Sequence, residues 1–197
     1  LLDRVGGDEE EILGVGVGVP APVDASTGVI SVPGIMRGWD DVAIGHVMTK
    51  RLGRPVLVDN DANLGALAES RLGASRPFQD SVYVRASFGT GAGVMIAGRL
   101  HRGFAGTAGE IGHVQVDPTG DICLCGSRGC LNMVVGAQQL LASLRASRGP
   151  LTLQDLVTLA NDGDPGCRQV VEDAGATIGT VVAGLSVALN PQCVVVG

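Results

Sequence analysis

The chain has 197 residues, of which 45% are hydrophobic, 17% charged and 3% aromatic, and it contains 31 glycines. This composition excludes a disordered tail and a fibrous repeat, and the length allows one domain or two small lobes with a buried core. With 14 basic and 20 acidic side chains the formal net charge is -6. The chain therefore lacks the basic excess that drives nucleic-acid binding through counterion release.

No segment has the sequence pattern of a membrane span or a secretory signal. The longest uncharged stretch, residues 174–197, is interrupted by Asn190-Pro191-Gln192, whereas a span needs about 20 continuous apolar residues. A buried helix followed by a buried strand is the better interpretation. The N-terminus lacks a basic region followed by an apolar run and a cleavage site. We expect a cytoplasmic protein with no membrane partner.

Strands alternate with helices along the chain, which is typical of α/β architecture. Alternating glycine and valine over residues 12–19 predict a buried strand closed by prolines. Asp40 and Asp41 are expected to open an amphipathic helix that ends near residue 52. A second strand is predicted over residues 55–58 and a second helix over residues 62–72.

The second half of the chain begins with a predicted hairpin: a strand over 81–87, a glycine turn over 89–93 and a return strand over 94–97. A glycine-rich loop, a short strand over 113–116 and an irregular segment follow. Cys167 and Cys193 are expected in the core. Helices are predicted over 131–147, 153–160 and 165–189, and a buried strand over 193–196.

The strongest chemical signal is a group of one histidine and three cysteines. Glycine-bearing turns in the Cys-Leu-Cys-Gly-Ser-Arg-Gly-Cys segment can aim three sulfurs at one point, and an imidazole completes a tetrahedral shell for Zn²⁺. Four protein ligands leave no open position, so the metal is expected to be structural. The alternative is a turn with buried, metal-free cysteines. The predicted ligands are His113, Cys123, Cys125 and Cys130.

Two further segments carry polar groups suited to sugar hydroxyls, each with a simpler alternative. Glu110 precedes His113 by three residues, which places a carboxylate beside an oriented imidazole, a pair that suits sugar hydroxyls. The alternative is that Glu110 merely orients His113 as a metal ligand. Asn60 and Asp61 follow a predicted strand, where α/β sheets collect ligands, but these residue types also cap helices. The glycine run at 89–93 can present backbone N–H groups to an anion, or simply turn a hairpin.

Taken in order, these residues resemble the ROK family of sugar kinases and sugar-responsive repressors, which has an actin/hexokinase-like, ribonuclease H-like ATPase fold. The resemblance covers nearly the whole chain and implies a fragment of a two-lobed protein. Residues 1–61 would be the remainder of the small N-terminal lobe, and residues 62–197 a large lobe with a zinc loop at 113–130, truncated at its C-terminus. The matching blocks are residues 17–24, 59–63, 89–93, 109–113 and 123–131.

The resemblance also implies roles for individual residues. Asp61 corresponds to the catalytic base of the kinases, and His113 would serve both zinc and sugar. The implied sugar ligands are Asn60, Asp61, Glu110 and His113, and the implied second phosphate loop is Gly89, Thr90 and Gly91.

Three departures from the family pattern favour the regulator branch or a fragment. The first phosphate motif, Asp-x-Gly-Gly-Thr, is absent, and the last strand resembles an adenosine-site motif cut short. Asn132 stands where sugar-binding members carry glutamate; its amide can still bond a hydroxyl, without charge. Gly34 follows Pro33 where the kinases tend to have asparagine.

We therefore expect the sugar-sensing effector domain of a ROK-type repressor, which binds a sugar or sugar phosphate. DNA would be bound only through an N-terminal helix-turn-helix outside this chain, and a homodimer or higher homo-oligomer is expected. The alternative is a glucokinase-like hexose kinase that uses ATP and Mg²⁺ with Asp61 as base. A purely structural zinc module is the third possibility.

Overall fold

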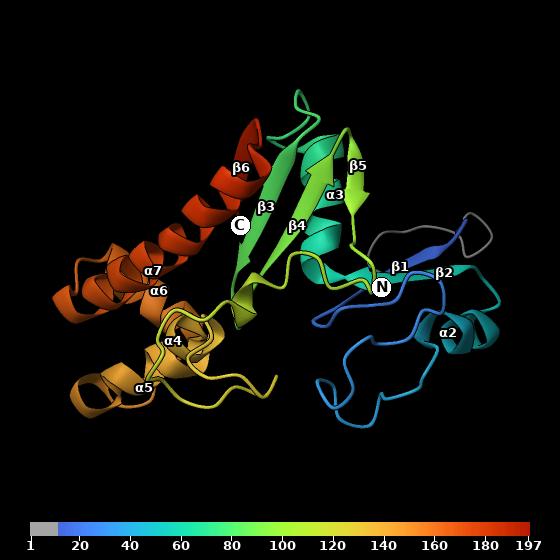
Figure 1. The fold of residues 1–197 in the computed structure, drawn as a ribbon. Coiled ribbons are helices and arrows are strands. Elements are labelled where there is room, and N and C mark those ends of the chain that lie inside the picture. The colour runs from blue at the N-terminus through green and yellow to red at the C-terminus, as the bar shows by residue number, and fades with distance from the viewer. Residues whose placement is uncertain (1–11) are drawn as a thin grey trace.

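The computed structural model describes residues 12–197, which form two β-sheets with helices between and around them (Figure 1). Residues 1–11, the start of the predicted small lobe, lie outside the described part. The α/β class predicted from the alternation of elements is confirmed. The two-stranded parallel sheet consists of β1 (Val15–Val19) and β2 (Val56–Asn60). The second sheet has the order β5-β4-β3-β6, from β3 (Ser81–Ala86), β4 (Thr90–Ile96), β5 (Arg99–His101) and β6 (Cys193–Val196).

The helices follow the predicted order along the chain. Those predicted over 62–72, 153–160 and 165–189 are confirmed to within one residue at each end. The helices are α2 (Ile44–Leu52), α3 (Asp61–Leu72), the 3-10 helix η2 (Ile111–His113), α4 (Asn132–Val135), α5 (Ala137–Arg148), α6 (Leu153–Asn161) and α7 (Pro165–Leu189).

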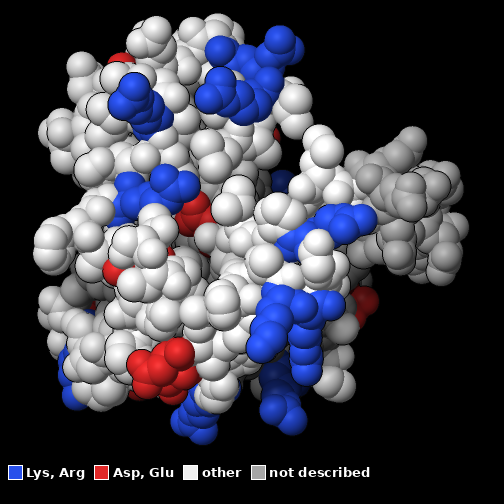
Figure 2. Space-filling view, turned by 90° about the vertical axis from the view of Figure 1, so that its right-hand side faces the viewer, with Lys and Arg blue, Asp and Glu red and all other residues white. Residues whose placement is uncertain are grey.

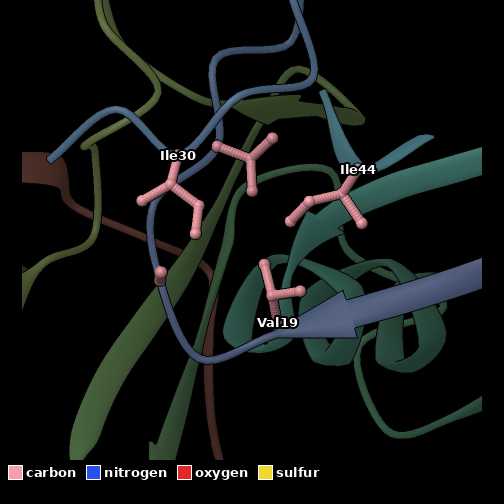
Figure 3. Close-up of a cluster of buried hydrophobic side chains, with 5 residues drawn as sticks. Val19, Ile30 and Ile44 are labelled. Carbon is pink, nitrogen blue, oxygen red and sulfur yellow. The ribbon is translucent and has the colours of Figure 1, made fainter. Parts of the chain in front are cut away.

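An apolar cluster joins the two-stranded sheet to the segment that follows β1. Val19, Ala21, Val23, Ile30 and Ile44 are buried together (Figure 3). The cluster connects the end of β1, the bridged pair Val23 and Ile30, and the first turn of α2. Burial of apolar surface stabilises the fold by about 25 cal/mol per Å², so this cluster holds residues 20–35 in one position. Those residues form one wall of the cavity described below.

The four-stranded sheet is packed on both faces, with α3 on one side and α7 on the other (Figure 1). Val82 and Val84 point to one face of β3 and pack with side chains of α7. Tyr83 points to the opposite face, because side chains alternate along a strand. There its ring lies against Gly65 of α3, where a Cβ would come within 2.2 Å of the ring. α3 therefore approaches the sheet more closely than side chains on both partners would allow.

α7 is long and apolar enough to cross a membrane by length and composition alone. One of its faces covers the sheet, through Ile178, Val181 and Leu185. α7 thus packs on the four-stranded sheet, as helices do in α/β proteins. The expectation of a buried helix and strand over residues 174–197 is wrong, because α7 buries only Cys167 and Ala174 fully. β6 is half-exposed along its length as well, and Cys193 is only partly buried instead of lying in the core.

The predicted start of the first helix is also wrong, because Asp40 has another partner and Asp41 has a non-helical backbone conformation. The Asp40 carboxylate accepts a hydrogen bond of 2.7 Å from the Gly34 N–H. Asp41 has φ 59°, in the left-handed region. α2 consequently begins at Ile44, with Ala43 as an N-cap that offers no side-chain acceptor.

The glycine run at 89–93 is mostly strand and not turn. β4 begins at Thr90 and pairs with β3, which leaves residues 87–89 as the turn. The glycines are needed for packing: a Cβ at Gly93 would lie 2.5 Å from the Ala62 carbonyl oxygen and from the Ala66 Cβ, both on α3. α3 can lie against β3 and β4 because neither Gly93 nor Gly65 has a side chain.

Two other predicted elements differ in the structure. The expected strand at 113–116 is absent: η2 ends at His113, and in the following residues only an isolated bridge joins Gln115 to Cys130. The expected helix at 131–147 is split into α4 and α5 at Gly136, whose ψ of 146° is extended. The break lets the Ala137 N–H donate to the Phe88 carbonyl oxygen, at 3.3 Å, beside the hairpin turn.

Replacement of Gly93 by alanine should destabilise the protein by about 1–3 kcal/mol, the usual effect of overpacking. The added Cβ would meet the backbone of α3, which cannot move independently of the helix. Gly16→Ala is the matched control, since Gly16 is also a strand glycine but has nothing within 4 Å of the added Cβ. Urea unfolding of both variants measures the difference, and equal free energies of unfolding would contradict the packing argument.

Candidate functional site

The junction of β2 and α3 is built around the Asn60 side chain. Its Oδ1 accepts hydrogen bonds from the backbone N–H groups of Ala62 (2.9 Å) and Asn63 (3.2 Å), which caps α3. Its Nδ2 donates to the Ala21 carbonyl oxygen at 3.3 Å. The capping role left open from the sequence is therefore present. Asn60 also lines the cavity, but its polar atoms already hold the backbone in place.

Asp61 follows as the first residue of α3, and its carboxylate faces an arginine. Arg85 Nη1 lies 3.3 Å from Asp61 Oδ2, and both side chains are partly exposed. Sequence reasoning did not identify Arg85. The available signal was a single charged residue in the predicted strand 81–87, on the same face as Tyr83. The carboxylate proposed to bind a hydroxyl thus already has a charged partner.

Glu110 and His113 lie at the two ends of η2, at the close of the glycine-rich loop. His113 Nε2 is 4.0 Å from Glu110 Oε2. Burial, and secondly the negative charge of Asp61, raise the pKa of Glu110 above its ordinary value. Burial lowers the pKa of His113, which favours the neutral imidazole. Groups whose charged forms are disfavoured in this way gather at binding and catalytic sites.

These groups line one cavity of about 520 Å³, between the two-stranded sheet and the hairpin of β3 and β4. A larger groove, of about 740 Å³, lies between α7 and residues 111–116, but no titratable side chain lines it. Convergent polar groups mark the smaller cavity as the candidate site. Its walls are Pro20, Ile35, Asn60, Asp61, Arg85, Phe88, Gly89, Thr90, Gly91, Glu110, His113 and Asn132.

Asn132 connects the turn of the hairpin to the rest of the site. Its Oδ1 accepts a hydrogen bond of 2.7 Å from the Thr90 N–H. A Cβ at Gly112 would lie 2.3 Å from Asn132 Nδ2, so the missing side chain makes room for the amide. The backbone donor at Thr90, expected from the sequence to face a phosphate, is therefore already satisfied by the protein.

The four residues expected to bind zinc lie together. Their ligand atoms are all within 4.8 Å of one another. Cys125 Sγ is 3.6 Å from Cys130 Sγ, and Cys123 Sγ is 3.5 Å from His113 Nδ1. Bonds of about 2.3 Å to sulfur and 2.0 Å to nitrogen at tetrahedral angles would separate such atoms by about 3.5–3.8 Å. The donor set and its spacing therefore fit Zn²⁺.

Metal binding would change the ionisation of the thiols. Burial, followed by the neighbouring Cys125 and Cys123 side chains, raises the pKa of Cys130 to about 12. A backbone hydrogen bond from Ser127 lowers the pKa of Cys125. Without a metal the raised pKa keeps Cys130 a neutral thiol; a bound divalent cation would favour the thiolate forms and offset the repulsion between them. His113 would contribute Nδ1 to the metal while Nε2 remains directed toward Glu110.

Comparison with known proteins gives a match along the whole chain. The sequence profile of the ROK family matches residues 1–197. The chain is 32% identical to the xylose repressor of Bacillus subtilis, over 93% of this chain and 47% of the repressor. It is also 32% identical to the glucokinase of Halalkalibacterium halodurans, over 96% of this chain and 62% of the kinase.

A solved structure shows the same fold. The crystal structure of a ROK family glucokinase from Streptomyces griseus, in complex with glucose and AMPPNP, superposes with a TM-score of 0.87 at 27% identity. The alignment covers 99% of this chain and 69% of that glucokinase. The chain thus spans about half the length of the repressor and less than two thirds of the Halalkalibacterium kinase.

Replacement of Cys125 by serine should remove zinc from the protein and lower its melting temperature. A structural metal contributes directly to folding, because the unfolded chain has no preformed site. A loss of 1 kcal/mol lowers the melting temperature by roughly 2–4 °C in a chain of this size. Cys193→Ser is the control, since Cys193 lies outside the cluster. Metal analysis beside thermal unfolding tests this, and unchanged zinc content in Cys125→Ser would contradict it.

Proposed function

The chain belongs to the ROK family and has its actin/hexokinase-like fold, and from that premise we propose that it is the sugar-sensing effector domain of a transcriptional regulator. The ligand is a sugar or sugar phosphate held in the cavity by Asp61, Glu110 and His113. Asn60 and Asn132 shape the cavity and hold its backbone. We further propose that residues 1–61 and 62–197 belong to two lobes, and that the protein is a cytoplasmic homo-oligomer.

The observation that carries this proposal is that two groups needed for phosphoryl transfer already have partners within the protein. Transfer requires a base near the acceptor hydroxyl and free backbone donors for the phosphates. Here the Thr90 N–H donates to Asn132, and the Asp61 carboxylate contacts Arg85. Both arrangements suit a site that binds a ligand without turning it over.

Charge supports a separate DNA-binding part. The chain carries a formal net charge of -6. On the face in Figure 2 the basic side chains lie in separate groups with neutral and acidic side chains between them, and not in a continuous stripe. Phosphate contacts supply much of the affinity for DNA and need such a stripe. We propose that DNA is bound through a helix-turn-helix outside this chain.

The second candidate is an ATP-dependent hexose kinase with Asp61 as base, and the fold similarity to a glucokinase with bound glucose and AMPPNP favours it. In that case Gly89, Thr90 and Gly91 would face the phosphates, and Asn132 would have to release Thr90. ATP and Mg²⁺ would then be cofactors besides the zinc.

The two candidates are separated by measuring turnover and ligand-dependent DNA binding in the full-length protein. We expect little sugar-dependent release of ADP with glucose, xylose or glucose 6-phosphate, and operator affinity that changes with one of them. A sensor needs a coupling of only about 1–3 kcal/mol. Turnover near 10 per second, the median for enzymes, without any response of DNA binding would establish the kinase instead.

Glu110→Gln should weaken ligand binding about tenfold or more, because a hydrogen bond to a charged group contributes about 1.5–3 kcal/mol. The matched control is Glu172→Gln, since Glu172 is an exposed residue of α7, 64% accessible and away from the cavity. Isothermal titration with the same sugars gives both affinities. Equal affinity in the two variants would show that Glu110 does not bind the ligand.

A further inference from the structure

A buried carboxylate lies directly behind the candidate site without lining it. Asp59 is the second-last residue of β2, and its side chain is 11% exposed. Its Oδ1 accepts hydrogen bonds from the Asn60 backbone N–H (2.8 Å) and from Asn63 Nδ2 (2.9 Å). Asp59 therefore holds both the residue that caps α3 and the first turn of that helix.

The other oxygen of the same carboxylate holds an arginine from a distant part of the chain. Arg102 donates to Asp59 Oδ2 from Nε (3.0 Å) and from Nη2 (2.6 Å). The four donors together occupy both oxygens of the carboxylate, and charge-assisted bonds of this kind are the stronger ones. The two residues are 43 positions apart, so the contact joins β2 to the segment that follows β5.

Arg102 begins the loop that ends at Glu110. The loop is closed on itself by a hydrogen bond of 3.0 Å from the Ala108 N–H to the Arg102 carbonyl oxygen. Near its end, the Gly109 carbonyl oxygen accepts the Ala92 N–H at 2.7 Å, which attaches it to β4. A shift of Arg102 would therefore be transmitted to the loop that carries Glu110.

We propose that the ion pair of Asp59 and Arg102 is a positioning element that fixes the Asp61 half of the cavity relative to the Glu110 half. Neither residue lines the cavity, so the pair acts through the groups that do. A ligand that bonds both halves needs them at a set separation, and misplacement of about 1 Å is enough to weaken such a site strongly. This inference rests on the proposed sugar-binding function of the cavity.

The test compares Arg102→Gln with Arg148→Gln. Arg148 makes an equivalent ion pair with Asp164, through Nε at 3.0 Å and Nη2 at 3.2 Å, between α5 and the start of α7. It lies outside the residues that line the cavity. The control therefore removes an arginine–aspartate pair of similar geometry and exposure without touching the proposed coupling.

We expect Arg102→Gln to weaken binding of whichever probe the wild-type protein binds, among glucose, xylose and glucose 6-phosphate, by tenfold or more. Arg148→Gln should bind as the wild type does, even if its melting temperature falls by a similar amount. Arg102→Lys keeps the charge and should restore part of the affinity. Unchanged affinity in Arg102→Gln, or an equal loss in Arg148→Gln, would overturn the proposal.

Hydrogen exchange gives a second readout that does not depend on a ligand. Amides of residues 103–110 and the capped amides of Ala62 and Asn63 should exchange at least about tenfold faster in Arg102→Gln than in Arg148→Gln. If none of the three sugars binds the wild type, the proposed binding of these sugars is refuted. The hydrogen-exchange comparison then tests the positioning role by itself. Equal exchange in the two variants would then refute it.

Discussion

The close approach of α3 to the four-stranded sheet is the constraint on which the site depends. It is possible because Gly65 on the helix and Gly93 on the strand leave space that a Cβ would fill, against Tyr83 and against the backbone of α3. The helix begins at Asp61, so its distance from the sheet also sets where that carboxylate lies. Asp61 reaches Arg85 on β3 as a result. The packing at these two glycines thus sets the distance between Asp61 and Arg85 in the cavity.

The proposed metal cluster and the cavity are mechanically connected through two consecutive residues. Cys130 is followed by Leu131, which is completely buried, and then by Asn132, which bonds the Thr90 N–H. A metal that fixes Cys130 would therefore also fix the turn of the hairpin. His113 provides a second connection, since one ring nitrogen faces Cys123 and the other faces Glu110. Zinc in this position would stabilise the cavity without taking part in chemistry.

The charges in and behind the cavity divide into two sets with different tasks. Asp59 and Arg102 neutralise each other away from the cavity, with all four donor contacts made. Asp61 and Glu110 face the cavity, and their mutual proximity contributes to the raised pKa of Glu110. Held by a scaffold that is already satisfied, Glu110 and the Asp61–Arg85 pair face the cavity in which a ligand would be bound. Such a division is expected where a site must be preorganised.

Sequence alone was sufficient for the α/β class, most of the regular elements and the grouping of His113 with three cysteines. These signals are local, because capping, periodicity and ligand spacing act over a few residues, as the match of α7 to residues 165–189 illustrates. The prediction from sequence failed where a residue had a competing partner outside its own helix or strand. Asp40 bonds Gly34 instead of capping α2, and the glycines after residue 89 serve packing instead of a turn.

Only the tertiary structure decided which polar groups of the site are free. Asp61 and Asn132 looked available for a ligand in the sequence, yet each has a partner brought to it by the fold. Asp59 bonds Arg102 across 43 residues and Thr90 bonds Asn132 across 42. No residue pattern reports such pairings, because they depend on how sheets and helices pack and not on the chain near either residue. The residue types were thus set by the sequence, and their roles by three-dimensional contact.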